Sequence, residues 1–301
     1  MFRHRLPALL GLCILLLLGL RLSYEIAFDR FHVHRRAVTP WTEIYQGVSY
    51  LSKRLPDDPE GRGMMHLIRV DLNVPGTGVY VRPYFQTEAD PQAGFYHLEY
   101  PWQFAKREHL AVTVNGTYFS PLQPAFALPG PLRKLCFYGG LASQSGPLVI
   151  DHHVVGDKGH GVFIWLDDDL TPHMRNHSWR QNLKDLEIGR FAFTNWYPMV
   201  QDGQLGTGAV PVKISQLHAR TALGIDTDKR LLYLAGFERA SYLMVARQLM
   251  LEGVRDAITF DGGGSSCLTI GEEARHIQPG TVLGGLRPVG TMVGIRANPL
   301  P

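Results

Sequence analysis

One segment of the chain combines a carboxylate with consecutive glycines. Asp261 follows the apolar stretch 257–260, and the residues after it are, in order, Gly262, Gly263, Gly264 and Ser265. Glycines let a backbone come close to a ligand, and successive N–H groups can form a nest for an anion. A carboxylate that ends a buried strand and enters such a turn lies at the edge of its sheet. The segment therefore predicts a ligand site, the alternative being a tight turn that Asp261 caps.

A second polar turn follows another apolar stretch, 111–114. The residues after that stretch are Asn115, Gly116, Thr117, Tyr118 and Phe119. Asn115 offers both a hydrogen-bond donor and an acceptor at the end of the expected strand. The rings of Tyr118 and Phe119 are suited to line a sugar site or an apolar pocket. The alternative is a plain turn with two aromatic core residues.

Arginines stand next to two further short motifs. Arg220 and Thr221 open an apolar stretch that runs to 225, and Arg287 precedes Pro288. A guanidinium group binds phosphate or carboxylate through two parallel hydrogen bonds. Both arginines are candidates for holding an anion, although an arginine at the start of a strand is more often simply solvated.

The order of these motifs resembles the phosphodiester glycosidase family over roughly residues 100–296. That family has N-G-x-[FY]-F after a strand, as at 115–119 here, and R-T-A-x-G opening a hairpin, as at 220–224. It then has A-x-x-x-D-G-G-x-S after a helix, as at 257–265, and a late R-P-V, as at 287–289.

Two positions depart from the family pattern. The family often carries G-G-P-x-L before the arginine motif, whereas residues 195–199 of this chain read Asn-Trp-Tyr-Pro-Met. Bulky Trp196 and Tyr197 in place of glycines are expected to narrow the site, so the substrate can differ. Cys267 stands where a small polar residue is more usual.

The resemblance implies an exported hydrolase that cleaves the glycosidic bond of a sugar-1-phosphodiester, such as an N-acetylglucosamine-1-phosphodiester or an envelope glycopolymer. Most glycosidases need two carboxylates. A phosphate monoester leaves as a stable anion, so one carboxylate plus cationic donors can suffice. We expect Asp261 to act as nucleophile, base or oxocarbenium stabiliser, Arg220 to clamp the phosphate, and Asn115 to orient the sugar. The alternative is a non-catalytic binding module for phosphorylated glycans.

A wider set of residues is expected to bind substrate, and neither a cofactor nor a metal is predicted. The substrate-binding set consists of Gly116, Tyr118, Phe119, Thr221, Gly262, Gly263, Gly264, Ser265 and Arg287. A serine nucleophile is disfavoured because no G-x-S-x-G motif is present. Scattered histidines in 152–160 and the acidic run 167–169 are interpreted as solvated loops.

These candidates must be positioned by a strand-rich fold. We predict helices over 101–109 and 241–252 and a hairpin turn at 226–230. Residues 120–160 and 167–190 read as mostly irregular. Strands are expected at 44–51, 65–72, 79–85, 111–114, 162–166, 220–225, 231–237, 257–260, 267–270 and 291–295. This order predicts an α+β domain over 43–301, with a mixed, mostly antiparallel sheet core and a few packed helices.

The N-terminus carries a separate signal. A basic start, Arg3 to Arg5, precedes an apolar run over 6–20, which is typical of a signal peptide or a signal anchor. We assign 1–28 to this segment, favour an uncleaved membrane anchor, and assign 29–42 to a linker. The domain would then face the periplasm or cell envelope, or be secreted if the segment is cleaved. A disulfide between Cys136 and Cys267 stays open.

The composition excludes several other classes of protein. Hydrophobic residues make up 45% of the 301 residues and charged residues 19%, which excludes wholesale disorder. The net charge is only +3, and no basic stripe runs along the chain, so nucleic acid is not an expected partner. Three cysteines are too few for a disulfide-rich scaffold.

Overall fold

The computed structural model describes residues 38–56, 59–82, 95–122, 139–155, 161–177, 189–209 and 216–301. Strands dominate this part of the chain, and each of the extended ladders within it is antiparallel. Its α-helices are α2 (Pro101–Arg107) and α3 (Tyr242–Leu251). The predicted α+β class is therefore confirmed only in its antiparallel sheet core, because the fold is sheet-rich and has little helix.

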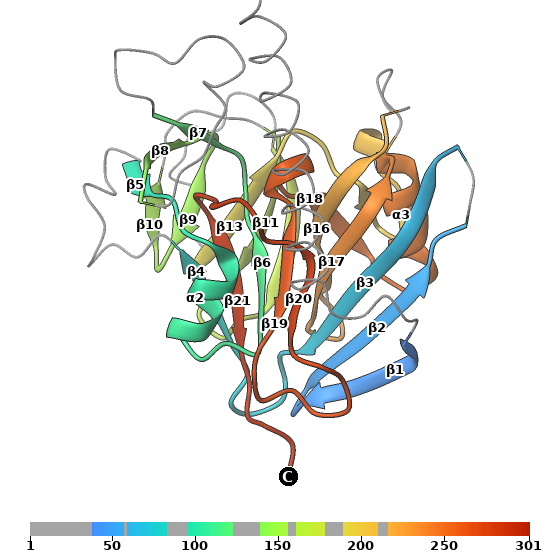
Figure 1. Ribbon diagram of the computed structural model, residues 1–301. Coiled ribbons are helices and arrows are strands. Elements are labelled where there is room, and N and C mark those ends of the chain that lie inside the picture. Colours follow the sequence, from blue (N-terminus) through green and yellow to red (C-terminus); the bar gives the residue numbers. More distant parts are fainter. Residues whose placement is uncertain are drawn as a thin grey trace, which may run out of the picture.

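The largest sheet has eight strands and carries the arginine motif and the strand before Asp261 (Figure 1). Its strands, in spatial order, are β1 (Val38–Tyr45), β2 (Val48–Arg54), β3 (Gly61–Asp71), β17 (Leu231–Ala240), β16 (His218–Asp226), β18 (Asp256–Thr259), β14 (Val200–Gln201) and β15 (Gln204–Leu205). The hairpin predicted at 226–230 is confirmed, since Asp226 pairs with Leu231.

A five-stranded sheet carries the asparagine motif. Its spatial order is β20 (Gly280–Gly284), β19 (Cys267–Ile270), β6 (Val112–Asn115), β21 (Met292–Arg296) and β4 (Gly78–Arg82). The predicted strand 267–270 coincides with β19. Since β6 pairs with β19 and β21, Asn115 lies at the end of a central strand.

Two smaller arrays complete the described fold. Five strands pair in the order β10 (His153–Val155), β9 (Leu148–Ile150), β13 (Phe191–Asn195), β11 (Gly161–Leu166) and β12 (Pro172–His177). Three more pair as β5 (Phe95–His97), β8 (Leu141–Gln144) and β7 (Phe119–Pro121). Short 3-10 turns occupy η4 (Thr207–Ala209) and η5 (Gly263–Ser265).

The core lies between the sheets, and the helices cover outer faces. On β17, Leu232 and Leu234 belong to the large core shared by the sheets, whereas Tyr233 and Ala235 pack in the cluster that includes α3. This is the alternation that a strand buried on both faces requires. Helix α2 packs over β6 and β19 (Figure 1). Ser241 caps α3, with its hydroxyl accepting from the Met244 N–H at 3.0 Å.

Several expected elements differ from the structure. The stretch 44–51 is divided between β1 and β2 by a turn in which Gly47 has a φ of +74°, a conformation that glycine adopts at little cost. Strands β8, β9 and β10 lie within 120–160, and β12 lies within 167–190, both of which were interpreted as mostly irregular. Strands β9 and β10 are only three residues long and β12 is polar, so each depends on a neighbouring strand that completes its ladder.

The expected boundary at the N-terminus also needs correction. Strand β1 begins at Val38, inside the stretch 29–42 that was predicted to be a linker. The apolar run 6–20 lies outside the described residues. Among the residues that are described, none of the helices has the length and apolar character needed to cross a membrane.

Candidate active site

The backbone of Asp261 is held against two strands of different sheets. Its N–H donates to the Gly116 carbonyl at 3.0 Å. Its own carbonyl accepts from Asn115 Nδ2 at 2.7 Å and from Thr221 Oγ1 at 3.3 Å. The ends of β6, β16 and β18 are thereby joined at one edge, which fixes where the turn 261–265 begins.

Asn115 is the centre of this junction. Its side chain is 1% exposed. Besides the bond from Nδ2 to Asp261, its Oδ1 accepts from Thr221 Oγ1 and from the Cys267 N–H, both at 2.9 Å. The Asn115 amide is thus hydrogen-bonded within the protein through both its donor and its acceptor atoms. This arrangement suits a positioning role, whereas the sequence suggested contact with the sugar.

The carboxyl group of Asp261 lies in a partly buried, polar setting. Burial raises its pKa above the ordinary aspartate value, while the Ser265 hydroxyl, the Arg287 charge and the Gly262 N–H oppose that rise. The Ser265 side chain is buried and bonds to the carboxylate. A carboxyl with a raised pKa beside a cation is the kind of group that exchanges protons near its working pH.

Arg220 approaches the first glycine of the turn. Its guanidinium group stacks on the Tyr242 ring, with Cζ 4.0 Å from the ring centroid. Two long hydrogen bonds to carbonyls hold it, from Nε to Ala240 at 3.3 Å and from Nη2 to Gln216 at 3.4 Å. Nη1 lies only 3.2 Å from the point that a Cβ on Gly262 would occupy. The side chain is 9% exposed, so its charge is largely removed from water.

Arg287 approaches the same turn from the segment after β20. Its Nη1 lies 3.4 Å from the point that a Cβ on Gly264 would occupy, and its Cζ lies 5.7 Å from the centroid of Phe119. Its Nε is buried and has no hydrogen-bond partner among the described residues. The two arginines therefore flank one glycine turn, and Arg287 retains an unused buried donor.

Two tyrosines connect these groups. The Tyr118 hydroxyl bonds to that of Tyr242. Burial raises the pKa of Tyr118, and the neighbouring Tyr242 and Asp261 raise it further, whereas Arg220 opposes them. Tyr118 is therefore a protonated donor at neutral pH. Tyr242 is not among the site residues predicted from the sequence, which assigns it only to the helix 241–252. The sequence feature that could have pointed to Tyr242 is its position directly after Ser241, the cap residue of α3.

The residues that depart from the family pattern lie beside β18. Asn195 ends β13, and its Nδ2 donates to Thr259 Oγ1 at 2.8 Å. Trp196 and Tyr197 follow and are 59% and 55% exposed. Thr259 is two residues before Asp261, so these exposed rings belong to the same edge of the fold.

Of the three cysteines, Cys267 lies within the described residues. Cys267 is a free, fully buried thiol whose pKa burial raises to about 12, while Cys136 lies outside the described residues. Among the described residues, no disulfide joins Cys267. Across the described ranges, no group of three or more His, Cys, Asp or Glu side chains is arranged to hold a metal ion.

Comparisons with known proteins identify relatives of this arrangement. A family model described as phosphodiester glycosidase matches residues 108–296. The catalytic domain of zebrafish N-acetylglucosamine-1-phosphodiester alpha-N-acetylglucosaminidase, auto-inhibited by its pro-peptide, superposes with a TM-score of 0.56 at 16% identity. That match covers 88% of this chain and 86% of that one.

Two further solved structures share the fold. A hypothetical protein from Synechocystis has a TM-score of 0.52 at 11% identity, covering 86% of this chain and 64% of that one. A putative exported protein from Burkholderia pseudomallei has a TM-score of 0.50 at 13% identity, covering 78% and 74%. No curated protein matches the chain in sequence.

Proposed function

The chain belongs to the phosphodiester glycosidase family, and on that premise we propose that it hydrolyses the glycosidic bond of a sugar-1-phosphodiester. The observation that carries the proposal is the convergence of Arg220, Arg287 and the Asp261 carboxyl on one glycine turn. The name of the zebrafish relative supports N-acetylglucosamine as the sugar. An envelope glycopolymer is the broader substrate class.

The arginines supply the phosphate site. One guanidinium group approaches Gly262 and the other approaches Gly264, so both lie close to the glycine turn. A phosphodiester carries one negative charge. When its glycosidic bond breaks, the phosphate monoester that is released gains a second negative charge. Fixed cations in a partly desolvated site stabilise that developing charge more than water does. Arg220 clamps the phosphate from the β16 side, and Arg287 offers its free Nε from the other side.

Asp261 supplies the acid–base chemistry. In the reaction, a water oxygen bonds to the anomeric carbon, the carbon–oxygen bond to phosphate breaks, and the phosphate monoester departs as an anion. Because that leaving group needs little protonation, one carboxylate serves. Asp261 stabilises the positive charge at the anomeric carbon, as nucleophile or electrostatically, or takes the proton from water as base.

The neighbours of Asp261 divide into contacting and positioning residues. Arg287 Nε and the N–H groups of Gly263 and Gly264 are the donors that the described residues leave available to substrate. Asn115 and Thr221 are buried and bonded to the protein, so they position the turn. Exposed Trp196 and Tyr197 offer aromatic faces to the part of the substrate that extends beyond the phosphate.

We further propose that the domain works outside the cytoplasm, anchored to a membrane. The support is the basic start and the apolar run over 6–20. A fusion of alkaline phosphatase to the C-terminus tests this location, since that reporter is active only after export. An inactive but intact fusion would refute export.

Hydrolysis in H₂¹⁸O tests the reaction directly. The full-length chain is incubated with α-linked N-acetylglucosamine-1-phosphodiesters, and both products are analysed by mass spectrometry. Cleavage at the glycosidic carbon places ¹⁸O on the released sugar. Label on phosphate would instead indicate a phosphodiesterase and contradict the proposal. Tight binding without turnover would favour the non-catalytic binding module.

A further inference from the structure

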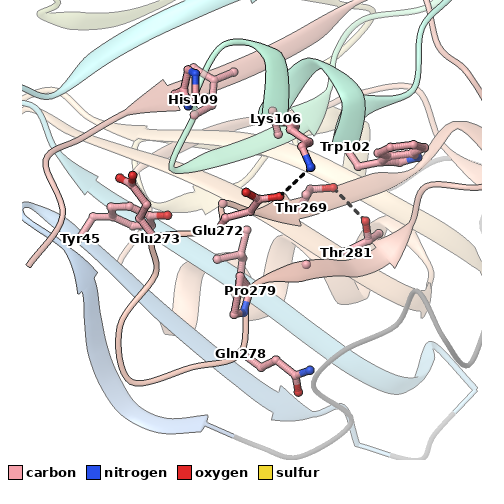
Figure 2. Close-up of a pocket in the computed structure, with 15 residues that line it drawn as sticks. Tyr45, Trp102, Lys106, His109, Thr269, Glu272, Glu273, Gln278, Pro279 and Thr281 are labelled. Atoms are coloured by element: carbon pink, nitrogen blue, oxygen red, sulfur yellow. Dashed lines mark hydrogen bonds and ion pairs between the residues drawn. The ribbon is translucent and has the colours of Figure 1, made fainter.

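A second concave site lies at the other end of β19 from the Asp261 turn. It is a cavity of about 440 Å³ between α2 and the strands β19 and β20 (Figure 2). Strand β19 begins at Cys267, which bonds to Asn115, and ends at Ile270, which lines the cavity. A strand of this length separates its ends by about 10 Å. The cavity is therefore distinct from the candidate active site.

One wall of the cavity is an aromatic face. Trp102 projects from α2 beside Thr269 and Thr281 (Figure 2). Its ring stacks on Tyr100 with centroids 5.8 Å apart and planes at 27°, which restrains the indole. Ala105 and Leu110 add apolar surface. Such a wall suits a flat ligand face that presents C–H groups.

The base of the cavity carries two hydroxyl groups. Thr269 and Thr281 pair directly across β19 and β20, with their Oγ1 atoms 3.2 Å apart. Both side chains are buried, at 5% and 4% exposed. A hydroxyl has one donor and two acceptor sites, so the pair keeps acceptor capacity for a ligand hydroxyl.

The rim of the cavity is acidic. Glu272 and Glu273 lie there with Lys106, whose Nζ is 3.4 Å from Glu272 Oε1 (Figure 2). Two carboxylates against one ammonium carry one net negative charge. The Asp261 site has the opposite balance, because Arg220 and Arg287 face one carboxylate. An anionic ligand is therefore disfavoured at the rim.

We propose that this cavity binds an uncharged or amino-substituted pyranose unit of a glycan. The C–H face of the ring lies against Trp102, and ring hydroxyls bond to the threonine pair. An amino group, where present, lies near the two glutamates. The proposal depends on the contacts of the cavity alone and requires no turnover at Asp261.

Three pyranoses that differ mainly in charge test the proposal: glucose, glucosamine and glucuronate. Binding to the full-length chain is measured by ligand-observed NMR, in a detergent without a sugar headgroup. Glucose and glucosamine are expected to bind, and glucuronate to bind at least about threefold more weakly. Trp102→Ala should weaken glucose binding about tenfold. Trp165→Ala, which lies outside the cavity, should leave glucose binding unchanged.

A charge variant keeps the test decisive if Trp102→Ala does not fold. Glu272→Gln and Glu273→Gln change exposed side chains, and each should strengthen glucuronate binding about twofold to threefold. Glucuronate bound as tightly as glucose by the unmodified chain would overturn the proposal. Retention of glucose binding in folded Trp102→Ala, or no binding of any of the three sugars, would also overturn it.

Discussion

Two adjacent glycines allow the arginine clamp to be separated from the stability of its turn. At Gly262 the backbone has a φ of −104°, which alanine adopts freely, but the new Cβ would lie 3.2 Å from Arg220 Nη1 and 3.3 Å from the Ala219 carbonyl. At Gly263 the φ is +63°, and no atom lies within 4 Å of the new Cβ. One substitution therefore displaces a catalytic group, and the other strains the backbone.

The two effects have different expected magnitudes. In Gly262→Ala, the guanidinium must shift by a few tenths of an ångström while it stays stacked on Tyr242. Since a misplacement of about 1 Å can cost about a hundredfold, we expect kcat/KM to fall about tenfold with stability nearly unchanged. In Gly263→Ala, the left-handed conformation costs about 1 kcal/mol of unfolding free energy, with a smaller loss of activity.

Urea unfolding and sugar release, each measured on both variants, test these two expected effects. The two substitutions add the same methyl group to neighbouring residues, so each is the control for the other. Loss of activity in Gly263→Ala with unchanged activity in Gly262→Ala would refute the assignment of Arg220 as the phosphate clamp.

Three further predictions follow from the contacts of the site. Thr221→Val removes a buried hydrogen-bond donor to Asn115 and should lower the free energy of unfolding by about 1–2 kcal/mol. Urea denaturation measures this loss, and an unchanged midpoint would contradict it. Because the Arg287 charge lowers the pKa of the Asp261 carboxyl, Arg287→Gln should move the acid limb of the kcat/KM–pH profile to higher pH, and a shift to lower pH would contradict this. Tyr242→Phe keeps an aromatic ring under the Arg220 guanidinium, whereas Tyr242→Leu removes it. The KM for phosphate-containing substrate should therefore be about three- to fivefold lower in Tyr242→Phe than in Tyr242→Leu.

Local patterns allowed the central elements of the fold to be predicted. The helix after Ser241, the hairpin at 226–230 and the strand β19 each carry a signal within a few neighbouring residues: a cap, a turn or an apolar run. Strand β12 is polar and carries no such signal, and the apolar run of β9 is only three residues long. Strand β12 forms because it pairs along its length with the apolar strand β11, and β9 forms because it pairs with both β10 and β13.

The candidate site shows the same limit. Sequence motifs marked Asp261, Arg220 and Arg287, and the fold places all three around one turn. The role of Asn115 was less accessible, because its partners Thr221 and Cys267 are far along the chain. Tyr242 was missed as a site residue for the same reason, since its partner Arg220 comes from another element.

The central claim is that Asp261 acts on a sugar-1-phosphodiester. The most direct test is sugar release by Asp261→Asn, with Asp202→Asn, an exposed carboxylate, as the matched control. The account predicts a loss of kcat of at least about a hundredfold in Asp261→Asn, with the folded state retained and Asp202→Asn fully active. Unchanged turnover in folded Asp261→Asn would contradict it.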